Sequence, residues 1–246
     1  MPIRRAAIAS RTLFFDLDGT LTDSKLGITR CIVHALRGMG REAPPEQDLG
    51  WCVGPPLAQS FARLLGTADP ATLDRALALY RERFGSVGLF ENALYPDVLA
   101  TLEILAGAGY RQVVVTSKPH VYARRIAEHF GLMDSIESVY GSELDGTRGD
   151  KGELIAHVLQ ARGLSPRQVL MIGDREHDVR GAARCGVATI GATWGYGGAA
   201  ELAGHGARRL AERMTVLPAL VIEAFASYDL EGDAKEAQVA PEPTDR

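Results

Sequence analysis

The sequence predicts an α/β protein with a parallel sheet, interrupted near the N-terminus by a helical insertion. From Pro96 onward, short apolar runs alternate with stretches that have helical spacing. This alternation is typical of βαβ units, which place parallel strands side by side and put ligands at their carboxyl ends. Between residues 24 and 90, apolar residues recur only at helical spacing. We therefore expect a helical domain inserted after the first strand.

The first strand leads directly into two aspartates. A short apolar run ending in Phe14-Phe15 precedes Asp16-Leu17-Asp18-Gly19-Thr20. If the strand continued, Asp16 and Asp18 would lie on the same face, because alternate side chains of a strand share a face. Two such carboxylates repel each other, and Mg²⁺ is a suitable partner because it prefers oxygen ligands. A turn in which the aspartates only cap backbone groups is the alternative.

The insertion contains three predicted helices. Ile28, Ile32, Leu36 and their neighbours form the first apolar stripe, and Leu57, Phe61, Leu64 and Leu65 form the second. Asp69-Pro70 predicts the N-cap and first turn of the third. A polar loop is expected over residues 42–48. We predict a cap domain at residues 24–90 and a core domain at residues 1–23 and 91–228.

The remaining elements follow in strict alternation. Helices are expected over residues 98–106, 119–130, 151–162 and 179–185. Strands are expected over residues 112–116, 136–140, 169–172 and 187–190, the last of these closing the sheet. Residues 229–246 carry much charge and few apolar side chains, so we predict a disordered tail.

Polar residues follow two of the later strands. Thr116 and Ser117 precede a helix, an arrangement that binds phosphate through hydroxyl and backbone N–H groups or merely caps the helix. Asp174 and Asp178, four residues apart, repel each other on one helical side, and a cation removes that repulsion. The alternative is that the helix dipole alone stabilises these two acidic residues at the helix N-terminus. Lys151 opposes that dipole at the start of its own helix, which favours a role in a site.

Composition restricts the function classes. The chain has 246 residues, 46% of them hydrophobic, and a formal net charge of -4. This slightly acidic balance argues against a nucleic-acid polymer as partner. The three cysteines Cys31, Cys52 and Cys185 lack close pairing, and no segment reaches the length of a membrane span. We expect a cytoplasmic protein with reduced thiols and no membrane contact; the oligomeric state is not readable.

Together these motifs resemble those of the haloacid dehalogenase superfamily. The resemblance covers residues 12 to 225 and implies a Rossmann-like parallel-sheet core with a small α-helical cap domain. It implies a Mg²⁺-dependent phosphatase that acts through an aspartyl-phosphate. It gives Asp16 the role of nucleophile and Asp18 that of general acid/base. The other roles it implies are phosphate binding by Thr116, Ser117 and Lys151, and Mg²⁺ binding by Asp16, Asp18 (through its carbonyl), Asp174 and Asp178.

A finer resemblance concerns the phosphoglycolate phosphatase branch. It rests on Gly54-Pro55-Pro56-Leu57, Thr116-Ser117-Lys118-Pro119 and Trp194-Gly195-Tyr196-Gly197. The branch often has Asn where Ser117 stands, so only the backbone N–H of that residue is carried over. The resemblance implies a small-molecule phosphate ester as substrate, with phosphoglycolate first. The alternatives are a nucleoside 5′-monophosphate phosphatase, a sugar-phosphate mutase, and a non-catalytic switch like a receiver domain.

Overall fold

The central element is a six-stranded sheet with the strand order β5-β4-β1-β6-β7-β8. The computed structural model describes residues 11–239, with side chains to Tyr228. All neighbouring strands of this sheet are parallel. Because β1 lies between β4 and β6, the residues that follow these three strands meet at one edge. The strands are β1 (Thr12–Phe15), β4 (Arg111–Pro119), β5 (Ser138–Ser142), β6 (Val169–Gly173), β7 (Ala188–Ala192) and β8 (Arg209–Ala211).

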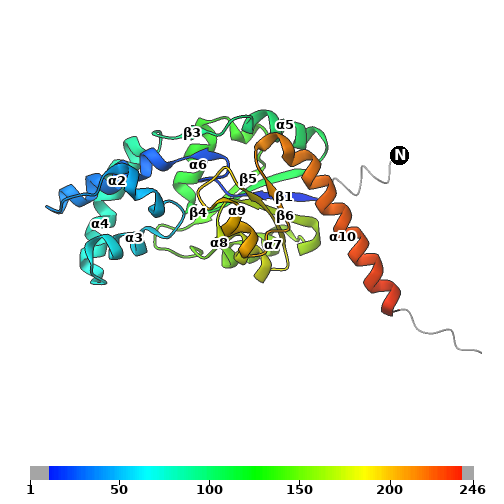
Figure 1. Cartoon of the computed structure of the whole chain (residues 1–246). Helices are drawn as coiled ribbons and strands as arrows, with labels where there is room; N and C mark the ends of the chain where they lie inside the picture. Colours follow the sequence, from blue (N-terminus) through cyan, green and yellow to red (C-terminus); the bar gives the residue numbers. More distant parts are fainter. Residues whose placement is uncertain (1–10, 240–246) are drawn as a thin grey trace, which may run out of the picture.

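Helices cover both faces of the sheet (Figure 1). Leu13 and Phe15 of β1 belong to a buried cluster that includes residues of α5 (Val98–Gly107), α6 (His120–His129) and α10 (Leu217–Val239). Phe14 belongs to a second cluster with residues of α7 (Lys151–Arg162) and α8 (Glu176–Arg184). Alternation along one strand thus supplies both core layers. The remaining elements are α9 (Gly198–Gly204), η3 (Leu132–Asp134), η4 (Pro166–Gln168) and η5 (Met214–Val216).

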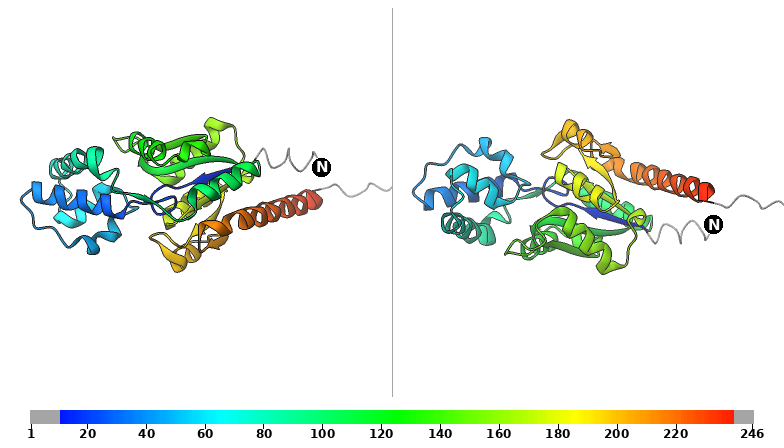
Figure 2. Two further views of the ribbon diagram at one scale, coloured as in Figure 1. Left: turned by 90° about the horizontal axis from the view of Figure 1, so that it is seen from above. Right: turned by 90° about the horizontal axis from the view of Figure 1, so that it is seen from below.

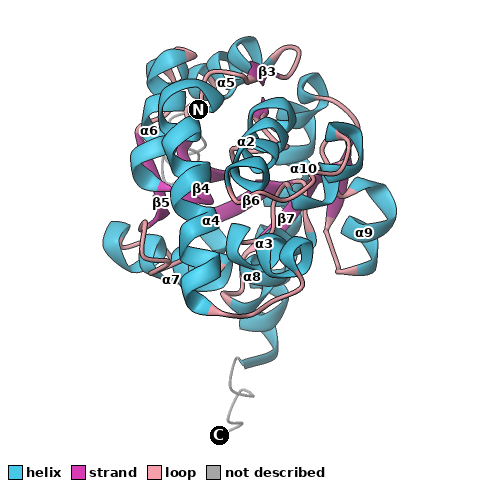
Figure 3. Ribbon diagram, turned by 90° about the vertical axis from the view of Figure 1, so that its left-hand side faces the viewer, coloured by secondary structure: helices cyan, strands magenta, loops and turns pink. Residues whose placement is uncertain are grey.

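The insertion, residues 24–90, is helical and is called the cap below; the rest is called the core. Two short antiparallel strands, β2 (Thr22–Asp23) and β3 (Ala93–Leu94), connect the two parts. Figure 2 shows the cap at one end of the sheet, with these strands running between the two parts, and Figure 3 shows the cap from its outer side. The cap elements are α2 (Lys25–Gly38), η1 (Glu46–Cys52), α3 (Leu57–Leu65), α4 (Pro70–Arg83) and the short π-helix η2 (Phe84–Gly88).

Local signals in the sequence account for several element boundaries. The Asp69 side chain accepts a hydrogen bond from Thr72 N at 2.9 Å and caps α4, with Pro70 in the first turn. The Asp150 side chain caps α7 in the same way, accepting from Glu153 N at 3.0 Å. Gly163 ends α7 in the left-handed conformation that glycine adopts without strain.

Other predictions were incomplete. Strand β8 follows the strand that we expected to close the sheet; it is short and mostly exposed, so it lacks an apolar run. Part of the loop expected at 42–48 belongs to the 3₁₀ helix η1, and α8 begins at Glu176, before its first apolar residue. Helix α10 extends through residues 229–239, and disorder of the tail stays a prediction. Residues 1–10 and 240–246 lie outside the described part.

Candidate active site

The loops after β1 and β6 touch each other at the carboxyl edge of the sheet. Asp16 follows β1, and its N–H donates to the carbonyl of Ile172 at 2.9 Å. The chain then turns through Gly19, whose φ of +85° lies in the left-handed region. A Cβ on Gly19 would stand 2.2 Å from Asp174 Oδ2. Only glycine therefore allows this turn to pack against Asp174.

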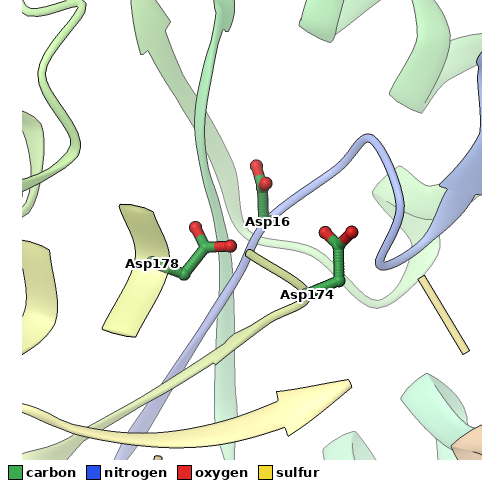
Figure 4. A group of neighbouring side chains, drawn as sticks. All are labelled: Asp16, Asp174 and Asp178. Carbon is green, nitrogen blue, oxygen red and sulfur yellow. The ribbon is translucent and has the colours of Figure 1, made fainter. Parts of the chain in front are cut away.

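Three carboxylates gather where these loops meet (Figure 4). Asp174 is fully buried and accepts hydrogen bonds from the Thr20 hydroxyl at 3.1 Å and from Tyr196 N at 2.8 Å. Asp178 lies in the first turn of α8, where its Oδ2 accepts from Arg175 N at 3.1 Å. One oxygen each from Asp16, Asp174 and Asp178 lies within 4.8 Å of the other two. The structure thus brings these predicted residues together.

The ammonium group of Lys151 joins two of these carboxylates. Its Nζ lies 3.0 Å from Asp16 Oδ1 and 2.8 Å from Asp178 Oδ1, and it donates to the carbonyl of Val115 at 3.1 Å. Lys151 is the first residue of α7. Its position against the helix dipole is offset by the two carboxylates that it contacts.

Burial shifts the protonation equilibria of this cluster. It raises the pKa of Asp16, against the opposing effect of Lys151, and raises the pKa of Asp174 well above 3.8, with Asp178 and Asp16 adding to the rise. Burial alone would lower the pKa of Lys151, but Asp16 and Asp178 outweigh it and raise that pKa. The carboxylates are crowded and the lysine is firmly charged.

A divalent cation fits this cluster. When all three carboxyl groups are ionised, the one ammonium group, which contacts two of them, leaves two negative charges in a buried site. Buried charges of one sign are costly unless a counterion compensates them. Oxygen donors are the ligands that hard cations such as Mg²⁺ prefer. The donor set and the excess charge therefore both match a divalent metal.

Thr116 and Ser117 differ in their relation to the cluster. Thr116 is buried, accepts a hydrogen bond from Lys118 N at 3.3 Å, and bonds through its side chain to Asp16, which lowers the pKa of that carboxyl group. The carbonyl of Ser117 accepts a hydrogen bond from the Ser142 hydroxyl at 2.8 Å. Phosphate binding by the N–H of Ser117 stays a prediction.

The Asp18 side chain does not join the cluster. Strand β1 ends at Phe15 and the chain turns from Leu17, so the alternation that would align Asp18 with Asp16 does not apply. Its carboxylate pairs instead with Lys118, whose Nζ lies 3.0 and 2.8 Å from the two oxygens. Lys118 was not predicted as a site residue, although its position two residues after Thr116 was a usable signal. Metal binding through the Asp18 carbonyl stays a prediction.

The cap closes over this edge next to Asp174. The Arg175 guanidinium donates to the carbonyl of Val53 in the cap at 2.7 Å and pairs with Glu201 of the core at 2.9 Å. Gly54 has a φ of +104°, and a Cβ there would lie 2.8 Å from the Arg175 guanidinium. This cap loop is thus docked beside a metal-ligand candidate.

A parallel sheet thus presents an aspartate, a lysine and a cluster of carboxylates under a helical cap, an arrangement that suits metal-assisted hydrolysis. The family described as haloacid dehalogenase-like hydrolase matches residues 13–192. The chain belongs to this family. The fold agrees with a solved structure of a predicted phosphatase from Clostridium acetobutylicum, with a TM-score of 0.82 and 36% identity, covering 87% of this chain and 98% of that one.

Several curated relatives are similar over most of this chain. A 5′-nucleotidase of Pseudomonas aeruginosa is 47% identical over 203 residues, which cover 82% of this chain and 91% of the relative. The tyrosine-protein kinase PtkA of Mycobacterium tuberculosis is 40% identical over 185 residues, 75% of this chain but 62% of that protein. A phosphoglycolate phosphatase of Rhodospirillum rubrum is 34% identical over 194 residues, 76% of this chain and 80% of the relative.

No helix within residues 11–239 is both long enough and apolar enough to cross a membrane.

Proposed function

We propose that this chain, a phosphatase of the haloacid dehalogenase-like family, hydrolyses nucleoside 5′-monophosphates with the help of Mg²⁺. The cluster of Asp16, Lys151, Asp174 and Asp178 carries the proposal, since it offers a carboxylate nucleophile, a fixed cation and a metal site. The substrate follows from the relatives. Similarity to the 5′-nucleotidase, at 47%, exceeds the 34% to a phosphoglycolate phosphatase, so our order of substrates reverses the sequence-based one.

The residues of the chain divide the chemistry between them. Asp16 attacks phosphorus and forms an aspartyl-phosphate, while Asp18 protonates the leaving alkoxide. Asp18 then takes a proton from the water that cleaves this intermediate. Lys151 holds Asp16 in place and compensates charge on the transferring phosphoryl oxygens. A divalent cation held by Asp16, Asp174 and Asp178 neutralises phosphate charge when bound.

A panel of esters tests this proposal. The purified full chain is assayed with MgCl₂ on 5′-AMP, 5′-UMP, 2-phosphoglycolate and glucose 6-phosphate, and the released phosphate is measured. We expect kcat/KM to be highest for the nucleotides, by about tenfold or more, because a pocket that contacts the leaving group discriminates by about 1–3 kcal/mol per missing contact. Asp16→Asn serves as the inactive control.

Each outcome has a distinct meaning. Phosphate release no faster than that of Asp16→Asn, with every ester, would exclude the hydrolase. A preference for 2-phosphoglycolate would restore the sequence-based order of substrates. An isomerised glucose phosphate with little free phosphate would indicate a mutase, and one phosphorylation without turnover would indicate a receiver-like switch.

The similarity to PtkA favours one second candidate, transfer of phosphate from ATP to a tyrosine. Incubation of the chain with labelled ATP and Mg²⁺, followed by measurement of label on tyrosine, distinguishes the two. We expect free phosphate and no stable label, because the proposed acceptor is water.

A further inference from the structure

Lys118 is a buried charge that the proposed chemistry leaves without a role. Its side chain is 5% exposed and that of Asp18 13%. Both carboxylate oxygens accept from the same Nζ, at 3.0 and 2.8 Å. A carboxylate that accepts hydrogen bonds at both oxygens cannot rotate freely about the bond that joins it to Cβ. Lys118 therefore limits the orientations of the proposed acid.

The cap supplies the other side of this ion pair. Nζ of Lys118 lies 4.7 Å from the centre of the Phe84 ring, within the range of a cation–π interaction. Phe84 is the first residue of η2, a single turn of π-helix, which is a geometry often found at functional sites. It stacks on Tyr80 of the cap at 5.2 Å and meets Tyr122 of the core edge-on at 5.2 Å. The ring thus lies at the interface between cap and core.

We propose that Lys118 is a positioning residue that aims the Asp18 carboxyl group at the leaving oxygen, and that Phe84 makes this position depend on the docked cap. The inference rests on the proposed function. With the cap docked, the ring shields the ammonium from water and strengthens its hold on Asp18. With the cap lifted, water hydrates the lysine and its ion pair with Asp18 weakens. The acid is then aligned only over an enclosed substrate.

The leaving group provides a readout that separates this role from others. An alkyl leaving group, such as the ribose of 5′-AMP, departs as a strong base and needs the proton from Asp18. The nitrophenolate of p-nitrophenyl phosphate is a weak base and needs little help. Departure of the leaving group belongs to the first step, which kcat/KM reports. The second step is common to both esters and affects kcat for both.

The experiment compares the wild type with Lys118→Met. For 5′-AMP, or for phosphoglycolate if that ester turns over faster, we expect kcat/KM to fall about 10²-fold, within the range of general acid catalysis. For p-nitrophenyl phosphate we expect a fall of less than about threefold. The value of kcat falls for both esters because Asp18 also activates water. Lys118→Arg, whose guanidinium can donate to both carboxylate oxygens, recovers part of the alkyl activity.

Phe84 has a matched control within the cap. Phe84→Leu removes the ring from Lys118, and we expect the same selective loss for the alkyl ester, about five- to tenfold. Phe61 is also buried and packs edge-on against Tyr80 with ring centroids 6.3 Å apart. Phe61→Leu therefore makes the same substitution in the packing of the cap around Tyr80, at a ring for which no contact with Lys118 is found among the described residues. It should leave the ratio of the two kcat/KM values unchanged.

Equal losses of kcat/KM with both esters in Lys118→Met would overturn the inference. A lysine that binds the phosphate group, or one that only stabilises the structure, would affect both esters alike. A rise in KM alone would overturn it as well. If the wild type hydrolyses neither ester, the proposed function fails instead. Urea unfolding verifies that each variant is folded, and if Lys118→Met is not, Lys118→Arg and Phe84→Leu decide by the same ratio.

Discussion

Two buried lysines at the same edge of the sheet differ in the parts of the molecule that hold them. The side chains of Lys151 and Lys118 are 3% and 5% exposed. Lys151 contacts two carboxylates and a strand carbonyl, all from the core. Lys118 contacts one carboxylate of the core and one aromatic ring of the cap.

The difference separates two tasks. The contacts of Lys151 come from the loop after β1, from β4 and from α8, which pack together with α7 in the core. The surroundings of Lys118 are complete only while Phe84 is docked. Lys151 therefore provides a permanent charge for phosphate, whereas Lys118 responds to the position of the cap. Three predictions test this contrast.

The largest expected effect belongs to the core lysine. In Lys151→Met, Asp16 and Asp178 lose their shared cation and remain buried. Removing one partner of a buried ion pair costs about 3–5 kcal/mol, and loss of a charged phosphoryl contact lowers kcat by about 10³-fold. Urea unfolding and phosphate release measure the two effects. Mg²⁺ should restore part of the stability by replacing the lost charge.

The exposed Lys25 supplies the control. Lys25→Met should change the free energy of unfolding by less than about 0.5 kcal/mol, as surface substitutions usually do. If Lys151→Met were as stable and as active as Lys25→Met, the view of Lys151 as a fixed core charge would be wrong.

The second prediction concerns Mg²⁺ and pH, which should act on the carboxylate cluster around Lys151. Burial raises the folded-state pKa values of Asp16 and Asp174. Ionisation of these two buried groups should therefore cost the metal-free protein stability as the pH rises toward neutral. At a hundredfold excess over its Kd, Mg²⁺ should contribute about 2.7 kcal/mol at neutral pH, or about 5–10 °C in Tm.

Thermal unfolding with and without MgCl₂, from pH 5 to pH 8, measures this effect. The Mg²⁺ shift should shrink toward pH 5, where protons compete for the carboxylates. Asp174→Asn should lose most of the shift and be more stable than the wild type without metal, by on the order of 1 kcal/mol. A pH-independent shift, or one that survives in Asp174→Asn, would place the cation elsewhere.

Much of the sheet and half of the site were predictable from local sequence. Strand β6 has an apolar run, and helix α7 has a capping residue and a terminating glycine. The predicted ends of both elements were therefore nearly right. The residues after parallel strands must meet at one edge, which is why Asp16, Asp18, Thr116 and Asp174 were expected together. The family resemblance added Lys151 to the same site. Strand β8 carries no such signal, because an exposed edge strand needs no apolar face.

The partnership of Asp18 with Lys118 and Phe84 was not predictable in this way. It depends on where β1 stops and on how the cap docks, and neither is encoded in a local pattern. A lysine at the end of a strand has the sequence signature of a solvated side chain. Phe84, 34 positions earlier in the chain, lies against its ammonium group in the folded structure.

The smallest expected effect concerns Tyr196, which connects the two regions. Its N–H donates to Asp174 at 2.8 Å, its hydroxyl donates to Asp23 at 2.7 Å, and that hydroxyl accepts from Lys25 N at 3.1 Å. The loop that orients a metal-ligand candidate thus also binds the linker to the cap. Tyr196→Phe keeps the N–H and loses the hydroxyl. It should cost about 1 kcal/mol, or 2–4 °C in Tm, and leave the Mg²⁺ shift intact.

A double-mutant cycle with Asp23→Ala isolates this bond. If Tyr196 acts on the linker through Asp23, Tyr196→Phe should cost little in the Asp23→Ala background, and the coupling free energy should be about 0.5 kcal/mol or more. Additive losses would mean that the hydroxyl stabilises only its own loop. A loss of the Mg²⁺ shift would instead show that the linker and the metal site are not independent, so that the core cluster around Lys151 also depends on the cap.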